Sequence, residues 1–312
     1  ANAAYDIESL NRLCLERLST AKTTLSVINN SSPTDSSIQP STLRYWTIFA
    51  RFVIQAMLSL LKKEISDFLS SLIGYLVMGV FLIAVSLFMW VFPLELNVLN
   101  SGYANLDALF VLGPWVFLFL CPAVTMRLFS EENRTGTIEL LLTKPLNDWQ
   151  IIFAKFFAGW LLTIITLLPT LIFFYSVYQL GSTPGNIDTG GTWGSYVGLL
   201  FLSGGYVAIG LFASSLSSNQ IISFILAVFI SFIIYIGFDS LSSIFNNNFL
   251  EGLIIKLGIN AHYLSLSRGV IDSRDVLYFL SLITVFLLFT KTKIESRKWW
   301  MWKTKNGSTF WV

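Results

Sequence analysis

Candidate catalytic side chains lie close in sequence to the single histidine of the chain. His262 is followed by Ser265 and Ser267, and Arg268 and Asp272 come a few residues later. A histidine close to a serine can activate a hydroxyl nucleophile, but no Gly-x-Ser-x-Gly turn accompanies these serines. The pattern therefore favours a structural or surface role for His262. An enzyme whose activity depends on His262 or Asp272 is kept as an alternative.

Other residue patterns that carry chemistry are missing from the sequence. It contains no His-Glu-x-x-His metalloprotease motif and no Gly-x-x-x-x-Gly-Lys-Ser/Thr loop, so ATP is not bound through a P-loop. Its two cysteines, Cys14 and Cys121, are too few for a disulfide scaffold or a metal cluster. A net charge of +2 gives no reason to expect nucleic-acid binding. We predict no catalytic residue, no metal ligand and no directly bound cofactor.

Polar chemistry is concentrated in residues 130–155, SEENRTGTIELLLTKPLNDWQIIFAK, between two long apolar runs. Charged residues are 12% of the chain, against about 25% in soluble proteins, so such a polar segment indicates a docking element. The charged run Glu131, Glu132 and Arg134 leads to Gly136. We expect this run to form the charged rim of the element.

A short helix is predicted directly after Gly136. Thr137 can cap it through its hydroxyl, which leaves Glu139 in the first turn, where a carboxylate is favoured. Pro145 ends it. Its apolar residues share one face and form a ridge: Ile138, Leu141 and Leu142. Asn147 and Gln150 then resemble a capping pair that opens the next helix.

Uncharged runs of membrane length surround this element and predict six transmembrane helices. We expect them at residues 73–92, 108–126, 156–178, 196–216, 221–238 and 276–290. Pro114 and Pro122 are expected to kink the second helix, and Pro169 lies in the third. Between the span ends there is no Asp, Glu, Lys, Arg or His, which argues against an ion-coupled transporter. The predicted fold is an all-α polytopic membrane protein.

An amphipathic helix is predicted before the first span. Lys62, Lys63 and Glu64 lie on its polar side, opposite an apolar face formed by Leu58, Leu61, Ile65, Phe68 and Leu72. Such a helix lies in the membrane interface. Residues 1–56 contain no span, and we expect them to be a polar extension of unknown role that is dispensable.

The distribution of basic residues predicts the orientation. With six spans, both ends lie on one side, together with Lys62, Lys63, Arg127, Arg134, Lys144, Lys155, Lys291, Lys293, Arg297, Lys298, Lys303 and Lys305. The opposite side carries Lys256, Arg268 and Arg274. The positive-inside bias predicts that both ends and residues 130–155 lie on the cytoplasmic side of the membrane. We expect a protein of the bacterial inner membrane. The basic, aromatic tail at residues 292–312 suits an anionic lipid surface.

The run EENRTGTIELLLTKPLNDWQIIFAKFFAG resembles the signature of ABC-2 type permease subunits, over a match from about Met57 to about Lys293. Four stretches resemble the gliding-motility permease of gliding bacteria: SSLIGYLVMGVFLIAVSLFMWVF, LGPWVFLFLCPAVTMRLFSEE, GNIDTGGTWGSYVGLLFL and HYLSLSRGVIDSRDVLYF. The resemblance implies that the short helix is a coupling helix. The implied contacts with an ATPase subunit are Glu131, Glu132, Arg134, Gly136, Thr137, Glu139, Leu140 and Pro145.

The same resemblance implies the remaining organisation. Residues 57–72 would be the connecting helix, residues 73–291 the permease domain, and residues 249–274 an external element with His262, Arg268 and Asp272. ATP would be bound by a separate ATPase subunit, and a second permease copy or sister subunit would complete the transporter. An auxiliary subunit with a periplasmic domain and a role in gliding or secretion are also implied. The alternative is an ATP-independent membrane scaffold or channel subunit.

Overall fold

The computed structural model describes residues 55, 57–94, 96–100, 102–142, 147–181, 187–242 and 248–307, without the side chains at 140–142, 248, 250, 253 and 297–307. Pro145, the side chains of Leu140, Leu141 and Leu142, and nearly all of the predicted extension at residues 1–56 lie outside the described part. Within the described part every regular element is helical. The prediction of an all-α fold is therefore confirmed.

Six helical segments are long and apolar enough to cross a membrane: Leu72–Val91, Asp107–Thr135, Asp148–Leu180, Thr189–Leu216, Gln220–Ser242 and Ser273–Ser296. This agrees with the six predicted spans. The second and third segments are longer than predicted because their helices continue into the charged residues between them. The chain is a multi-pass membrane protein.

Several spans are built from consecutive helices. The first combines α3 (Leu72–Ser86) with the π-helical η2 (Leu87–Val91), and the second combines α4 (Asp107–Thr125) with α5 (Arg127–Thr135). The third runs through α7 (Asp148–Leu167), the 3-10 turn η3 (Leu168–Thr170) and α8 (Leu171–Leu180). The fifth runs through α10 (Gln220–Phe232), the π-helical η4 (Ile233–Gly237) and α11 (Phe238–Ser242). The fourth and sixth are α9 (Thr189–Leu216) and α14 (Ser273–Gly307).

The prolines act differently in two of these spans. α4 continues as one helix through both Pro114 and Pro122. Pro169 instead lies in η3, where the third span changes from α-helix to a single 3-10 turn and back. Proline removes a backbone donor and clashes with the preceding turn, so a local change in winding at Pro169 is the expected response.

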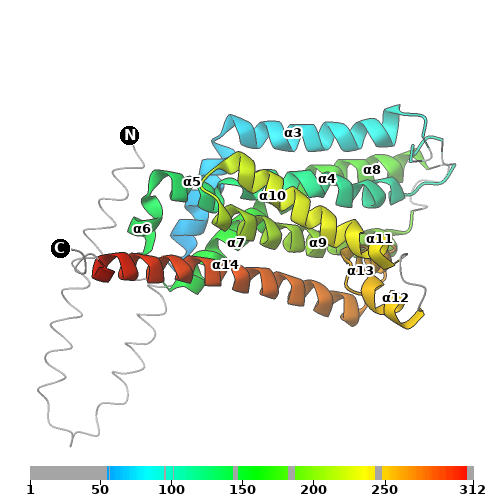
Figure 1. Cartoon of the computed structure of the whole chain (residues 1–312). Helices are drawn as coiled ribbons and strands as arrows, with labels where there is room; N and C mark the ends of the chain where they lie inside the picture. Colours follow the sequence, from blue (N-terminus) through cyan, green and yellow to red (C-terminus); the bar gives the residue numbers. More distant parts are fainter. Residues whose placement is uncertain are drawn as a thin grey trace, which may run out of the picture. The chain divides into compact units, whose positions relative to one another are not determined.

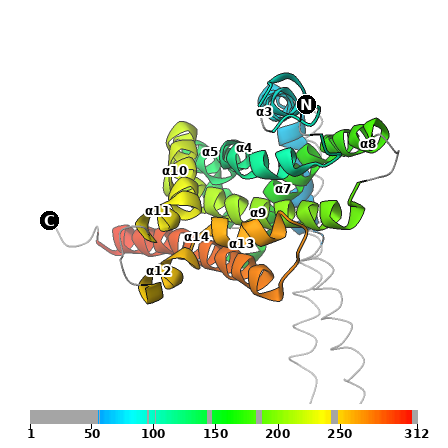
Figure 2. The same cartoon turned by 90° about the vertical axis from the view of Figure 1, so that its right-hand side faces the viewer.

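The central helix of the bundle is α9, which packs against α4, α5, α7, α10, α13 and α14. In Figure 2 it lies among these helices, whereas α3 and α8 lie at the periphery. Glycines permit the close approach of its neighbours. A β-carbon at Gly205 would lie 2.9 Å from Leu282 Cδ2 of α14, and one at Gly198 would lie 2.8 Å from Leu266 Cβ of α13. Small residues bring helices together in lipid in this way.

The helix that covers residues 57–69, drawn in blue, lies at the left end of Figure 1 with α5 and α6 (Thr137–Leu142). The right end carries α11, α12 (Asn248–Ile255) and α13 (Ile259–Leu266). The external element expected at residues 249–274 thus contains two short helices, α12 and α13. α14 reaches from one end to the other (Figure 1).

Candidate functional site

The charged run before Gly136 belongs to a helix. Met126 separates α4 from α5, and Glu131, Glu132 and Arg134 lie in the last two turns of α5. The sequence had predicted a polar rim here, outside a span that ended at Met126. The helical continuation means that motion of these residues moves α5 and the second span together.

A serine of α9 holds the junction between α4 and α5. Ser214 Oγ accepts hydrogen bonds from the backbone N–H groups of Phe129 at 2.9 Å and Ser130 at 3.1 Å. The same hydroxyl donates to Met126 O at 3.1 Å. The first two bonds satisfy backbone donors that the break in the helix would otherwise leave unpaired in a buried place, and Met126 O also accepts from the Ser130 hydroxyl. The start of α5 is thereby attached to the central helix.

The short helix predicted after Gly136 is present as α6. Gly136 ends α5 with a φ of 72°, in the left-handed region that glycine adopts without strain. Thr137 is the first residue of α6 and its hydroxyl lies 2.9 Å from that of Thr135, so the predicted capping role of Thr137 is wrong. Glu139 is exposed in the first turn, as expected. Ile138 is only 7% exposed, so this part of the predicted ridge faces the protein's own core.

A buried ion cluster lies next to α6. Lys155 of α7 is fully buried, and its ammonium donates to Glu64 Oε1 at 2.8 Å, to Glu132 Oε1 at 2.7 Å and to Leu128 O at 2.6 Å. Each of the three N–H groups therefore has an acceptor. The ammonium also lies 5.1 Å from the centre of the Phe129 ring.

A second lysine, Lys63, lies at the edge of this cluster and is shared between Glu64 and Asp67. Glu64 and Glu132 are each 12% exposed, and Lys63, which is half exposed, lies 3.8 Å from Glu64 Oε1. Glu132 Oε2 is buried and has no hydrogen-bond partner among the described residues. Buried charges are retained only where partners compensate for their lost hydration. The cluster therefore depends on Lys155.

One sequence prediction is wrong at this cluster. Glu64 was assigned to the polar side of the amphipathic helix, but it points inward, while Lys62 and Lys63 are exposed as predicted. Glu132 and Lys155 lie outside the predicted spans, although the second and third helical segments extend to include them. The spacing of Leu60, Glu64 and Phe68 could have predicted the inward position of Glu64. Leu60 and Phe68 lie one helical turn before and after Glu64, and both are buried.

The cluster joins three elements that are distant in sequence. Glu64 comes from the helix at residues 57–69, Glu132 from α5 and Lys155 from α7. Arg127, at the start of α5, donates to Ser71 Oγ at 3.2 Å and lies 5.5 Å from the centre of the Phe68 ring. Asn147 and Gln150 form the predicted capping box at the start of α7. The α6 end of the bundle is therefore a connected unit.

This arrangement coincides with a family match. Residues 53–291 match the ABC-2 family transporter protein, and this range includes every residue of the cluster and of α6. The chain belongs to the ABC-2 transporter family. No curated protein matches it. Members of this family are permease components of ABC transporters, so the chain is an ABC-2 permease component, and such components normally pair with an ABC ATPase subunit.

At the other end of this ABC-2 permease, both ring nitrogens of His262 have hydrogen-bond partners. Its Nδ1 lies 2.7 Å from Asp275 Oδ1, its Nε2 lies 2.9 Å from Lys256 O, and its ring stacks on Tyr278 with centres 4.0 Å apart. The Ser265 hydroxyl donates to Asp275 Oδ2 and not to His262. A nitrogen free to activate a serine is therefore missing at His262, which disfavours the nucleophile interpretation.

The external element is also attached to the spans. The buried Tyr263 hydroxyl donates to Phe110 O of α4 at 2.7 Å, and burial, with a smaller effect from Tyr235, raises the pKa of this phenol well above its ordinary value. Ser195 of α9 donates to Ser267 O at 2.8 Å. Of the predicted residues, Arg268 and Asp272 are exposed, whereas Asp275, which was not predicted, is buried and central.

Proposed function

We propose that this chain is the permease subunit that couples ATP hydrolysis on a separate ATPase subunit to transport or mechanical work. α6 is the coupling helix, and the end of α5 is its charged flank. Exposed Glu139 and Arg134, with half-exposed Glu131, supply charges that a soluble partner can contact. Glu132 is an exception among the predicted contact residues, because its carboxylate is directed to Lys155.

The observation that carries this proposal is the ion cluster of Lys155, Glu64 and Glu132. A partner that pushes on α6 moves α5, and Glu132 then pulls on Lys155 of the third span. The same ammonium holds Glu64, so the helix at residues 57–69 follows. Charged pairs buried in a low-dielectric place resist separation far more than exposed pairs do. Force applied at α6 therefore reaches two spans and the connecting helix.

The orientation and partners follow from this role. The basic residues of the α6 end favour a cytoplasmic position in a bacterial inner membrane. ATP is held by the partner ATPase, a second permease copy or a sister subunit completes the pathway, and membrane lipid surrounds it. The four stretches quoted above support the finer proposal of a gliding or secretion role, with an auxiliary subunit that carries a periplasmic domain.

Co-purification tests the docking assignment. Glu139→Arg, at an exposed position of α6, should abolish recovery of the ATPase subunit with the full chain while leaving the amount of chain in the membrane unchanged. Glu251→Arg in α12, at the other end of the bundle, is the matched charge reversal and should leave ATPase recovery at the wild-type level.

The outcome separates the proposal from its alternative. Recovery of the ATPase at wild-type yield with Glu139→Arg would show that α6 is not the contact. Recovery of a partner without a P-loop, lost in the same variant, would favour the scaffold or channel alternative.

A further inference from the structure

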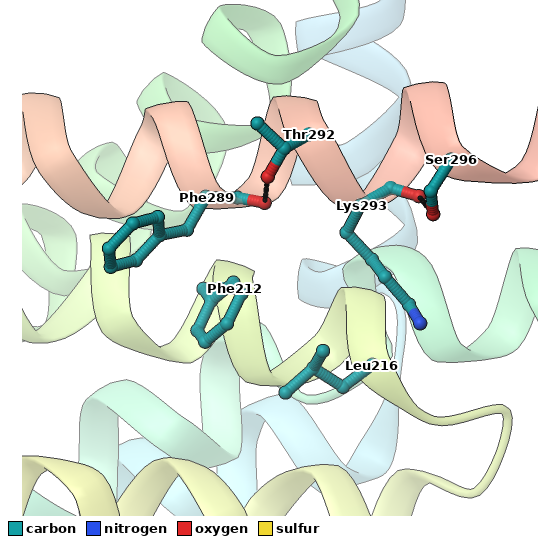
Figure 3. A pocket seen from close by; sticks show the side chains of 6 residues that line it. All are labelled: Phe212, Leu216, Phe289, Thr292, Lys293 and Ser296. Carbon is teal, nitrogen blue, oxygen red and sulfur yellow. Dashed lines mark hydrogen bonds between the residues drawn. The ribbon is translucent and has the colours of Figure 1, made fainter.

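A groove opens between α9 and α14 near the α6 end of the bundle. Its cavity volume is about 430 Å³. It is lined by Phe212, Leu216, Phe289, Thr292, Lys293 and Ser296 (Figure 3). None of these residues takes part in the ion cluster described above.

One side of the groove is an aromatic wall. The Phe212 ring of α9 has its centre 5.7 Å from that of Phe289 and 5.9 Å from that of Phe286, both on α14. Figure 3 shows Phe212 and Leu216 on one helix facing Phe289 on the other. Packed aromatic rings of this kind present a rigid apolar surface. The wall suits a hydrocarbon chain.

The polar side offers one free donor. The Thr292 hydroxyl donates to Phe289 O at 2.9 Å and the Ser296 hydroxyl donates to Lys293 O at 2.8 Å, so both hydrogens are already used. No carboxylate of the described residues lies within ion-pair distance of the Lys293 ammonium. Lys291 differs, since it pairs with Glu295 at 3.2 Å and lies 5.2 Å from the centre of the Trp149 ring. The Lys293 ammonium is therefore available to an anionic group of a ligand.

We propose that this groove binds one anionic phospholipid of the bilayer, with its phosphate at Lys293 and its acyl chain along Phe212 and Phe289. α14 changes there from an apolar span to a charged segment, which is the level where lipid headgroups lie. A lysine at a span end extends its ammonium toward that level. A soluble anion would use the ammonium but not the aromatic wall. The proposal is independent of the ATPase coupling proposed above.

The Lys293 ammonium can also interact with the C-terminal end of α9. α9 ends at Leu216, and Figure 3 shows the Lys293 side chain directed toward this end. A cation at the C-terminus of a helix is favoured by the helix dipole. This interaction needs no lipid, so the experiment has to measure bound lipid directly and not stability.

The test uses native mass spectrometry of the full chain, purified with its associated subunits at low salt. Dioleoylphosphatidylglycerol and dioleoylphosphatidylcholine are titrated separately. The wild type should bind one phosphatidylglycerol about fivefold more tightly than phosphatidylcholine, since one basic residue near the surface attracts an anionic lipid by that factor. Lys293→Gln should remove this preference. Lys291→Gln, two residues away but already paired, should keep it.

Two further measurements complete the test. Phe289→Ala should weaken the binding of both lipids, because it removes the wall that the acyl chain contacts. Inorganic phosphate at the lipid concentration should not displace bound phosphatidylglycerol. The proposal is overturned if Lys293→Gln keeps the preference, if Lys291→Gln removes it equally, or if phosphate competes.

Discussion

Removal of the Lys155 ammonium should be among the most damaging single changes at the α6 end. Lys155→Met keeps a long, unbranched apolar stem at this position. Glu64 and Glu132, however, lose the cation that lies 2.8 and 2.7 Å from them. Lys63 at 3.8 Å from Glu64 is half exposed and compensates only weakly. Breaking a buried pair by removing one partner destabilises by about 3–5 kcal/mol. For a domain of this size we expect the thermal midpoint to fall by roughly 6–20 °C.

A rescue variant separates lost charge from lost packing. Lys155→Met combined with Glu64→Gln and Glu132→Gln carries no charge at these three positions and nearly keeps the side-chain volumes. It should recover at least about half of the lost stability, because an unpaired amide costs less in a buried place than an unpaired carboxylate does. Lys291→Met is the control. Its partly exposed pair with Glu295 at 3.2 Å should change stability by no more than about 1 kcal/mol.

The assay is thermal unfolding of the full chain in detergent, followed by the change in tryptophan fluorescence. If the thermal midpoint of Lys155→Met fell by no more than that of the Lys291→Met control, the Lys155 ammonium would not stabilise the fold by compensating the buried carboxylates. A triple variant no more stable than Lys155→Met would show that packing, and not unpaired carboxylates, causes the loss.

Two further predictions concern the turn before α6 and the external element. Gly136→Ala should lower the free energy of unfolding by about 1–2 kcal/mol, because the φ of 72° at this position is left-handed. The added β-carbon would meet nothing within 4 Å, so the backbone angle is the cause. Gly79→Ala in α3 is the control, because its β-carbon also meets nothing, and it should be neutral or stabilising in thermal unfolding. Equal effects of the two changes would contradict the role of the φ angle. Asp275→Leu should speed amide exchange in α13 about tenfold, because His262 and Ser265 lose their acceptor. Exchange as slow as in the wild type would contradict that role, and exposed Arg268→Leu is its control.

The elements that depend on local chemistry could be predicted from the sequence. The bilayer sets the length of each span, so uncharged runs revealed six of them. The capping box of Asn147 and Gln150 needs only residues three positions apart, and it is present. The left-handed Gly136 between two helices likewise follows from a local rule, that a C-terminal cap favours glycine.

The parts that depend on tertiary contacts could not be predicted. Lys155 meets Glu64 and Glu132 across 91 and 23 residues, and no local pattern pairs them. Charge alone suggested that Glu64 was exposed, although Leu60 and Phe68 one turn away pointed inward. No local pattern singles out Ser214, yet its hydroxyl accepts from the start of α5. The contact of α6 with an ATPase and the role of residues 1–56 stay predictions.

The ion cluster also has a consequence for biogenesis. Glu64 and Glu132 precede Lys155 by 91 and 23 residues, so a ribosome that adds about 5–20 residues per second completes Glu64 some 5–18 s before Lys155. When the third span leaves the ribosome, the two carboxylates that neutralise its lysine have therefore already been made. Lys155 lies near the start of the third helical segment, and its buried ammonium finds both partners only when the earlier helices are in position. The order of residues along the chain thus lets the third span close the cluster as soon as it packs on a correctly placed amino-terminal half.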